Sequence, residues 1–94
     1  MREIERSSAF KRDFKRIYSN PRHKSNIDQV LIAVIDLLVL DQDLPPKFRD
    51  HDLIGSWNGY RECHIKPDVL LIYKKPNPTI LRLARLGSHS DLFG

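Results

Sequence analysis

The spacing of apolar residues changes along the chain from a helical to an extended pattern, and this change constrains the fold more than any other feature. Over residues 8–40 apolar side chains recur every three or four positions, which predicts two helices. From residue 57 onward they alternate or run together, which predicts strands. This order predicts an α+β fold, with two N-terminal helices packed on a small twisted antiparallel sheet. Ninety-four residues hold one hydrophobic core, so we expect a single domain over residues 1–94.

Ser7 and Ser8 are the candidate N-caps of the first helix, because a serine hydroxyl can accept a hydrogen bond from a free amide of the first turn. Phe10, Phe14 and Ile17 follow at helical intervals and form one apolar stripe. Basic residues occupy much of the remaining surface of this segment. The helix should end at the Asn-Pro pair that follows, because a residue before proline avoids the helical conformation.

The second helix is predicted to begin after an N-cap at Ser25 and to end near Leu40. Its apolar residues lie on more than one side, which predicts the central buried helix of the fold. A polar, proline-containing segment over residues 41–56 follows and is predicted to form a long irregular loop. Loops of this length in small domains are often functional.

Three strands are predicted, and they are Tyr60–Ile65, Val69–Tyr73 and Thr79–Leu86. Proline-containing turns separate them, so we expect an antiparallel meander. The middle strand is continuously apolar, which indicates a central position in the sheet. Residues 2–6 are a candidate fourth strand at an edge of the sheet.

The single cysteine, Cys63, excludes an internal disulfide and a cysteine-rich zinc site. We interpret it as a small buried apolar residue rather than a nucleophile. No apolar run reaches the length of a membrane span, and charges fill the first residues where a secretory signal needs an apolar core. We therefore expect a cytoplasmic protein that makes no membrane contact. The histidines lack metal-ligand spacings such as HExxH, so no metal or other cofactor is predicted.

Charge is distributed unevenly along the chain. Sixteen lysine and arginine residues against twelve aspartate and glutamate residues give a net charge of +4. Residues 1–24 carry a net +5, residues 25–58 a net −4 and residues 59–94 a net +3. If the two basic ends come together in the fold, they form a face suited to a polyanion such as RNA. An ordinary solvated surface explains the same pattern equally well.

Three histidines fall where the segments of a meander can converge. His51 lies in the long loop, His64 near the end of the first strand and His89 just after the last strand. Asp68 lies in the turn after His64. Imidazole exchanges a proton near neutral pH without special tuning, so these residues are candidates for one catalytic cleft. Taken singly, each histidine is more typical of a polar surface, and Asp68 is typical of a turn.

Arg61, Arg82 and Arg85 are the cations nearest to this set. Strand alternation predicts that Arg82 and Arg85 lie on opposite faces, so that only one of them serves the cleft. Arg85 lies closer to the end of its strand and is the preferred candidate. Such a set suits cleavage of an RNA phosphodiester. One group takes the proton of the 2′-hydroxyl, a second protonates the departing 5′-oxygen, and a cation stabilises the phosphate.

Four ordered segments carry a resemblance to a known family. They are Asp50-His51-Asp52-Leu53, the stretch from Gly55 to Asp68, Leu70-Leu71-Ile72-Tyr73, and the stretch from Arg85 to Phe93. With these segments in this order, the chain resembles the YafQ branch of the RelE/ParE toxin superfamily over essentially its whole length. The resemblance implies a toxin of a bacterial type II toxin–antitoxin module, built from two N-terminal helices and a small antiparallel sheet.

The resemblance further implies a ribosome-dependent endoribonuclease, an mRNA interferase that cuts mRNA in the decoding site and stops translation. It implies three partners, which are a cognate antitoxin that wraps the toxin, mRNA, and the ribosomal RNA of the decoding site. We expect the free toxin to be a monomer and the reaction to need no metal. Two alternatives stay open, a ParE-like toxin that binds DNA gyrase without catalysis and an inactive homologue that only binds antitoxin.

Carried over residue by residue, the resemblance implies a catalytic role for five positions. His89 would be the general acid. His51, His64 and Asp68 would supply the base or orient the substrate, and the division between these two roles stays open. Arg85 would hold the scissile phosphate.

Further positions are candidates for substrate binding. Phe93 would position a base of the mRNA, and Arg61 is a nearby cation. Lys11 and Lys15 of the basic first helix are candidate contacts to ribosomal RNA, although a solvated helix face has the same composition. Val69 departs from relatives that carry tryptophan after the turn aspartate, which predicts a different codon preference.

Overall fold

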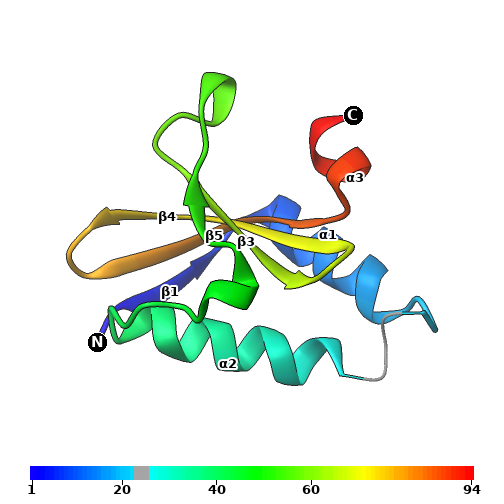
Figure 1. Ribbon diagram of the computed structural model, residues 1–94, viewed down its shortest axis with the longest axis horizontal. Helices are drawn as coiled ribbons and strands as arrows, with labels where there is room; N and C mark the ends of the chain where they lie inside the picture. The colour runs from blue at the N-terminus through cyan, green and yellow to red at the C-terminus, as the bar shows by residue number, and fades with distance from the viewer. Residues whose placement is uncertain (23–25) are drawn as a thin grey trace.

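The computed structural model describes residues 1–22 and 26–94 (Figure 1). The strands are β1 (Glu3–Arg6), β2 (His51–Asp52), β3 (Arg61–Lys66), β4 (Val69–Asn77) and β5 (Ile80–Gly87). The helices are α1 (Ser8–Tyr18), α2 (Ile27–Val39) and α3 (His89–Phe93), and two short 3₁₀ helices are η1 (Pro46–Phe48) and η2 (Gly55–Trp57). The N-cap predicted at Ser25 lies outside the described residues.

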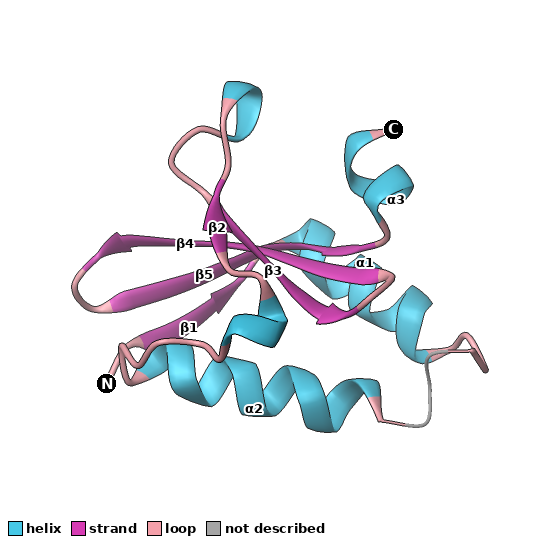
Figure 2. Ribbon diagram, viewed as in Figure 1, coloured by secondary structure: helices cyan, strands magenta, loops and turns pink. Residues whose placement is uncertain are grey.

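The five strands form one sheet in the order β1-β5-β4-β3-β2 (Figure 2). β3, β4 and β5 form the predicted antiparallel meander, and β2 extends it as a short antiparallel edge. β1 is the edge strand predicted from residues 2–6, but it runs parallel to β5, so the sheet is mixed. The predicted α+β fold class is confirmed.

The two faces of the sheet carry separate apolar clusters. α1 and α2 cover one face and, with the strands, bury most of the core side chains (Figure 1). The opposite face carries a smaller cluster, whose buried members are Leu70, Ile72, Ala84 and Leu92 of α3. Full burial of one aliphatic side chain stabilises a fold by about 1.5–3 kcal/mol. The larger cluster therefore holds the helices on the sheet, while the smaller one holds α3.

α1 begins as predicted. Ser7 Oγ accepts a hydrogen bond from the amide of Phe10 at 2.9 Å, so Ser7 rather than Ser8 is the N-cap. The helix ends at Tyr18, two residues before the predicted Asn-Pro boundary. Ser7 Oγ also donates to the carbonyl oxygen of Ala84 at 2.7 Å. The cap therefore joins the start of α1 to β5.

α2 is not the central buried helix that its composition predicted. It buries one face through Ile27, Leu31, Val34 and Leu38, whereas Ile32 is 58% exposed. The physical reason is that one layer of helices covers this face of the sheet, so the outer side of α2 meets solvent (Figure 2). Because apolar residues also occur on that outer side, the sequence pattern predicted that every side of α2 would be buried.

β5 contains an irregularity that the sequence did not reveal. Arg85 pairs with Ile72, and Arg82 pairs with Lys74. Ile72 and Lys74 lie on one face of β4 because they are two residues apart. Arg82 and Arg85 therefore also share a face, and the prediction of opposite faces is wrong. The cause is a β-bulge at Ala84, an extra residue that shifts the alternation of β5 by one.

The segment 41–56 is more ordered than the predicted loop. It contains η1 and β2, and η2 begins within it. Asp50 anchors its second half, because its carboxylate accepts hydrogen bonds from the Arg61 guanidinium and from the Tyr73 hydroxyl. Burial and the nearby Asp50 raise the pKa of Tyr73, so the hydroxyl remains a donor. This anchor places His51 beside β3.

The single cysteine lies in the interior of the protein. Cys63 is fully buried in β3, as predicted, and burial raises the pKa of its thiol. The thiolate, which is the nucleophilic form, is therefore disfavoured at this position.

Among the residues described, no helix is long and apolar enough to cross a membrane.

Candidate active site

A hollow of about 350 Å³ opens at the end of the sheet where β3 and β5 finish. Three segments bring polar side chains to it. β3 contributes Glu62 and His64, the β3–β4 turn contributes Asp68, and the start of α3 contributes His89. His64, Asp68 and His89 thus come together from separate segments of the chain, as the meander predicted.

His51 does not line this hollow but reaches it through Glu62. The two residues pair across β2 and β3, and His51 Nε2 lies 3.0 Å from Glu62 Oε2. The other ring nitrogen, Nδ1, lies 2.7 Å from the carbonyl oxygen of Arg49. Both neighbours are acceptors, and a neutral imidazole donates from one nitrogen only, so both contacts are hydrogen bonds only when each ring nitrogen carries a proton.

Glu62 is a site residue to which the sequence analysis assigned no role. Its side chain is buried, with 6% exposed, and it lines the hollow. Within the described part of the chain, no hydrogen-bond partner reaches Oε1. A buried carboxylate oxygen without a partner is destabilising, so this residue needs an explanation other than packing. The available signal was strand alternation, which places Glu62 and His64 on one face of β3.

α3 presents His89 and Phe93 on one side. Ser88 and Asp91 form a capping box, in which Ser88 Oγ accepts from the Asp91 amide at 3.1 Å and Asp91 Oδ2 accepts from the Ser88 amide at 3.0 Å. These contacts hold the pKa of Asp91 below its usual range. The ring centroids of His89 and Phe93 lie 5.0 Å apart, because residues four apart meet on one helix face. An aromatic surface therefore lies beside the predicted general acid.

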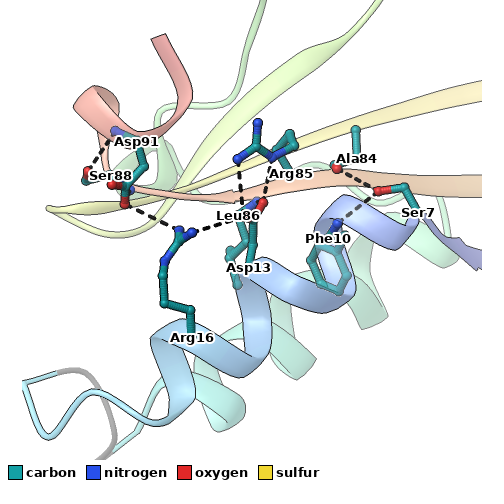
Figure 3. Close-up of polar contacts among 9 residues, drawn as sticks. All are labelled: Ser7, Phe10, Asp13, Arg16, Ala84, Arg85, Leu86, Ser88 and Asp91. Atoms are coloured by element: carbon teal, nitrogen blue, oxygen red, sulfur yellow. Dashed lines mark hydrogen bonds and ion pairs between the residues drawn. The ribbon is translucent and has the colours of Figure 1, made fainter. Parts of the chain in front are cut away.

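Arg85 is not among the residues that line the hollow; it lies near the end of β5, where Asp13 of α1 holds it (Figure 3). Arg85 Nε and Nη2 donate to the two carboxylate oxygens at 2.6 and 3.2 Å. The Asp13 carboxylate raises the pKa of Arg85, which keeps the guanidinium charged. This contact uses one edge of the guanidinium, and Nη1 points away from Asp13 (Figure 3). A cation of fixed direction thus stands close to α3.

The other predicted cations also lie outside the lining of the hollow. Arg61, next to Glu62 in β3, faces the opposite side of the sheet, and its guanidinium lies 3.0 Å from the Asp50 carboxylate. The contact with the Asp50 carboxylate gives Arg61 a structural role that requires no substrate. Lys11 and Lys15 are exposed on α1. They can meet a partner that approaches this helix but do not reach the hollow's lining.

The hollow combines two carboxylates with two imidazoles. Asp68 is partly buried, and its Oδ2 lies 3.5 Å from Arg22 Nη2, which ties the β3–β4 turn to the segment after α1. Groups of these kinds exchange protons with a substrate near neutral pH. Among the residues that the structure describes, no three histidine, cysteine or acidic side chains are grouped as metal ligands.

Comparison with known proteins identifies the family. Residues 2–94 match a family of bacterial toxins of type II toxin–antitoxin systems, YafQ. The chain belongs to the YafQ toxin family. The match includes both helices, the sheet and α3, so every element that frames the hollow falls within it.

Individual YafQ proteins are similar over their full length. The mRNA interferase toxin YafQ of Escherichia coli (strain K12) is 39% identical over 93 residues, which cover 99% of this chain and 97% of that protein. The crystal structure of YafQ from E. coli strain BL21(DE3) has a TM-score of 0.86 at 39% identity and covers 100% of both chains. A crystal structure of the E. coli DinJ-YafQ complex gives a TM-score of 0.85 at 40% identity, again over 100% of both chains. The family resemblance stated from the sequence is confirmed.

Proposed function

We propose that this toxin is a ribosome-dependent endoribonuclease that cleaves mRNA and stops translation. One observation carries the proposal, which is that His64, Asp68, His89 and the buried Glu62 line one hollow. Two imidazoles facing one space suit the paired proton transfers of phosphodiester cleavage. The relative in E. coli that is 39% identical is named an mRNA interferase toxin, which supports the same reaction here.

In the proposed reaction, neutral His64 takes the proton of a substrate 2′-hydroxyl. The 2′-oxygen attacks the adjacent phosphorus, forms a 2′,3′-cyclic phosphate and breaks the bond from phosphorus to the 5′-oxygen. Protonated His89 gives its proton to that 5′-oxygen, so a neutral 5′-hydroxyl leaves. The Arg85 guanidinium stabilises the charge that builds up on the phosphate, and no metal ion is required. The scheme needs one neutral and one protonated imidazole, so the rate should depend on pH as a bell-shaped curve.

His51, Glu62 and Asp68 orient the substrate in this scheme. His51 faces an acceptor at each ring nitrogen and does not line the hollow, so it is less suited than His64 to take a proton from the substrate. Glu62, whose side chain lines the hollow, orients the His51 ring beside the bound nucleotide. Phe93 is 39% exposed beside His89 and stacks on a base.

Two macromolecular partners complete the proposal. The first is a cognate antitoxin that covers the hollow, and the related E. coli toxin crystallised as the DinJ-YafQ complex supports it. The net charge of +4 suits an acidic antitoxin segment. The second partner is the ribosome, where exposed Lys11 and Lys15 contact ribosomal RNA.

Cleavage of mRNA on programmed ribosomes, mapped by primer extension, tests the function. Wild-type protein should produce discrete cuts, and His89→Ala should be slower by about 10²- to 10⁴-fold, the usual contribution of an oriented general acid. Gln42→Ala is the control, because Gln42 is exposed in the turn after α2. It should cleave at the wild-type rate.

A parallel reaction on free RNA with EDTA tests the metal requirement, because EDTA would also remove the Mg²⁺ that ribosomes need to stay assembled. Cuts of free RNA that persist in EDTA would support chemistry by side chains alone, whereas cuts that are made without EDTA and lost with it would show that a metal ion takes part. If folded wild-type protein cut no mRNA on ribosomes, the proposed function would be wrong. Inhibition of DNA gyrase by that same preparation would then favour the non-catalytic, ParE-like alternative.

A further inference from the structure

Asp13 is a buried carboxylate in a position where an apolar side chain is expected. It is 3% exposed and lies on the side of α1 that faces the sheet, among core residues such as Phe10 and Ile17. Among the described residues, only Asp13 and Glu62 are charged side chains of this degree of burial. A buried carboxylate is tolerated when hydrogen bonds and opposite charges replace its hydration. The partners of Asp13 therefore indicate its role.

The first partners of Asp13 belong to β5. β1 ends at Arg6, so the last residues of β5 have no neighbouring strand on that side, and α1 runs along them instead. Asp13 Oδ2 accepts a hydrogen bond from the backbone amide of Leu86 at 3.0 Å. The two oxygens also hold Arg85 through Nε and Nη2 (Figure 3). One carboxylate thus fixes both the strand edge and the direction of the guanidinium.

The second connection of Asp13 leads to α3 through Arg16. Arg16 Nη1 lies 3.4 Å from Asp13 Oδ1, and Arg16 Nη2 lies 3.5 Å from Asp91 Oδ2 (Figure 3). Asp91 is the residue that closes the capping box on Ser88. Packing is tight here, since a Cβ added at Gly87 would lie 3.1 Å from the Asp91 Cβ and 3.3 Å from Arg16 Nη2. The ion pairs therefore connect α1 to the turn that carries the proposed general acid.

We propose that Asp13 is a positioning residue of the active site, which sets the direction of the Arg85 guanidinium and, through Arg16, the position of the first turn of α3. The inference rests on the function proposed above. Asp13 does not line the hollow, so it acts through these neighbours and not on the substrate. Its connections reach both Arg85, the proposed phosphate-binding cation, and the turn that carries His89.

Stability alone does not account for a charge at this position. The Leu86 amide needs only a hydrogen-bond acceptor, which a neutral side chain such as asparagine would also supply, and a buried ion pair is often no more stabilising than apolar residues in its place. An apolar side chain would leave the Arg85 guanidinium free to rotate. Misplacement of reacting groups by about 1 Å can slow a reaction by about 100-fold. Asp13 therefore has a role in geometry that an apolar residue lacks.

Asp13→Asn is the main test, because the amide keeps an acceptor for the Leu86 amide and the shape of the side chain while it removes the charge. Asp36→Asn is the matched control, since Asp36 is exposed on α2. On programmed ribosomes we expect Asp13→Asn to lower the maximal cleavage rate by about 10- to 100-fold. The ribosome concentration at half-saturation should stay near the wild-type value, because the Lys11 and Lys15 contacts are unchanged. A folded Asp13→Asn protein with the wild-type maximal rate would overturn the proposal.

A double-mutant cycle distinguishes positioning from a general loss of stability. If Asp13 acts through Arg85, the double variant Asp13→Asn/Arg85→Ala should be little slower than Arg85→Ala alone. Rate losses that multiply would show that the two residues act independently, which contradicts the proposal for Arg85. Arg16→Ala tests the other connection without altering the buried carboxylate, and it should lower the maximal rate less than Asp13→Asn does.

A readout that does not depend on cleavage separates this inference from the proposed function. In NMR spectra, the Nε–Hε signal of Arg85 should shift in Asp13→Asn, and the amide signals of Ser88 and Asp91 should shift in both Asp13→Asn and Arg16→Ala. Unchanged signals in folded variants would overturn the positioning role, whatever the cleavage result. If wild-type protein cuts no mRNA but the signals shift as expected, the proposed function fails while the structural connection stands.

Discussion

Glu62 combines burial with an oxygen that has no partner among the described residues. Its other oxygen holds the His51 ring at 3.0 Å. The side chain lines the hollow where the substrate is proposed to bind, while one of its oxygens is committed to His51. A carboxylate kept in this state loses hydration without full compensation, which is typical of groups that a ligand completes.

Glu62→Gln should lower the cleavage rate by about 10- to 100-fold, because an amide binds the His51 ring more weakly than a carboxylate does and presents a donor in place of an acceptor. Single-turnover cleavage on programmed ribosomes measures this effect. Glu3→Gln is the matched control, since Glu3 is exposed in β1. Equal rates for Glu62→Gln and Glu3→Gln would show that Glu62 does not orient the substrate or His51.

The sequence was sufficient to place some site residues together and not others. His64, Asp68 and His89 follow strand ends and turns, and a meander brings such positions to one end of a sheet. Glu62 and Asp13 lie inside a strand and a helix, where local pattern predicts only which face they occupy. Their partners are 11 and 72 residues away in the chain, so the need for a charge appears only in the folded molecule.

At the scale of elements, α3 has five residues and is too short to be stable without support. Its support is the capping box between Ser88 and Asp91, the ion pair from Arg16, and the burial of Leu92 against the second apolar cluster. The capping box and the ion pair both depend on the charge of Asp91. The position of His89 therefore depends on the ionisation of a neighbouring carboxylate.

Acid should loosen α3 before it unfolds the sheet. The pKa of Asp91 in the folded protein is lowered from its ordinary value of 3.8, chiefly by the hydrogen bonds with Ser88. A group whose pKa is lower in the folded state contributes stability above its unfolded pKa, and that contribution is lost as pH falls through the folded pKa. Amide hydrogen exchange within α3 should therefore become faster, relative to β4, as the pH falls below 3.8.

Asp91→Asn provides the control for this acid effect. The variant should show weaker protection of α3 near neutral pH and little further loss on acidification, because the titrating group is absent. An equal acid dependence of α3 in the variant and in wild type would assign the effect to other carboxylates.

Element types were predictable from local pattern, whereas their relations were not. The apolar stripe and the N-cap at Ser7 predicted α1, and turn residues predicted the meander. The parallel direction of β1 depends on how the helices return the chain to β5, which no local signal encodes. The bulge at Ala84 is a mismatch in pairing between β4 and β5, so it cannot be recognised in either strand alone.

At the scale of the whole molecule, the two basic ends of the chain do come together. β1 pairs with β5, and α1 packs along β5. Their junction is largely neutralised, because Arg82 binds Glu5 and Arg85 binds Asp13. Apart from the proposed contact of Arg85 with the scissile phosphate, the basic charge available to a polyanion therefore lies on exposed residues beyond this junction, such as Lys11 and Lys15 of α1.

Replacement of Lys11 and Lys15 by alanine should weaken ribosome binding and reduce its dependence on salt. Each phosphate contact that is lost should lower the slope of log affinity against log salt by roughly one, so the double variant should lose up to about two. Binding measured at several salt concentrations gives this slope. The maximal cleavage rate should stay near wild type, because neither lysine lines the hollow.

A second double variant, with the same net charge as Lys11→Ala/Lys15→Ala, distinguishes a local contact with phosphate from a general effect of net charge. Lys74→Ala/Lys75→Ala also removes two positive charges, but these lie in β4, toward the hairpin that joins it to β5. If Lys11 and Lys15 contact ribosomal RNA, only their replacement lowers the slope, because contact with phosphate releases counterions and distant charge does not. Equal slopes for the two double variants would mean that α1 contributes net charge but no contact. The ribosome-facing surface would then have to be sought outside α1.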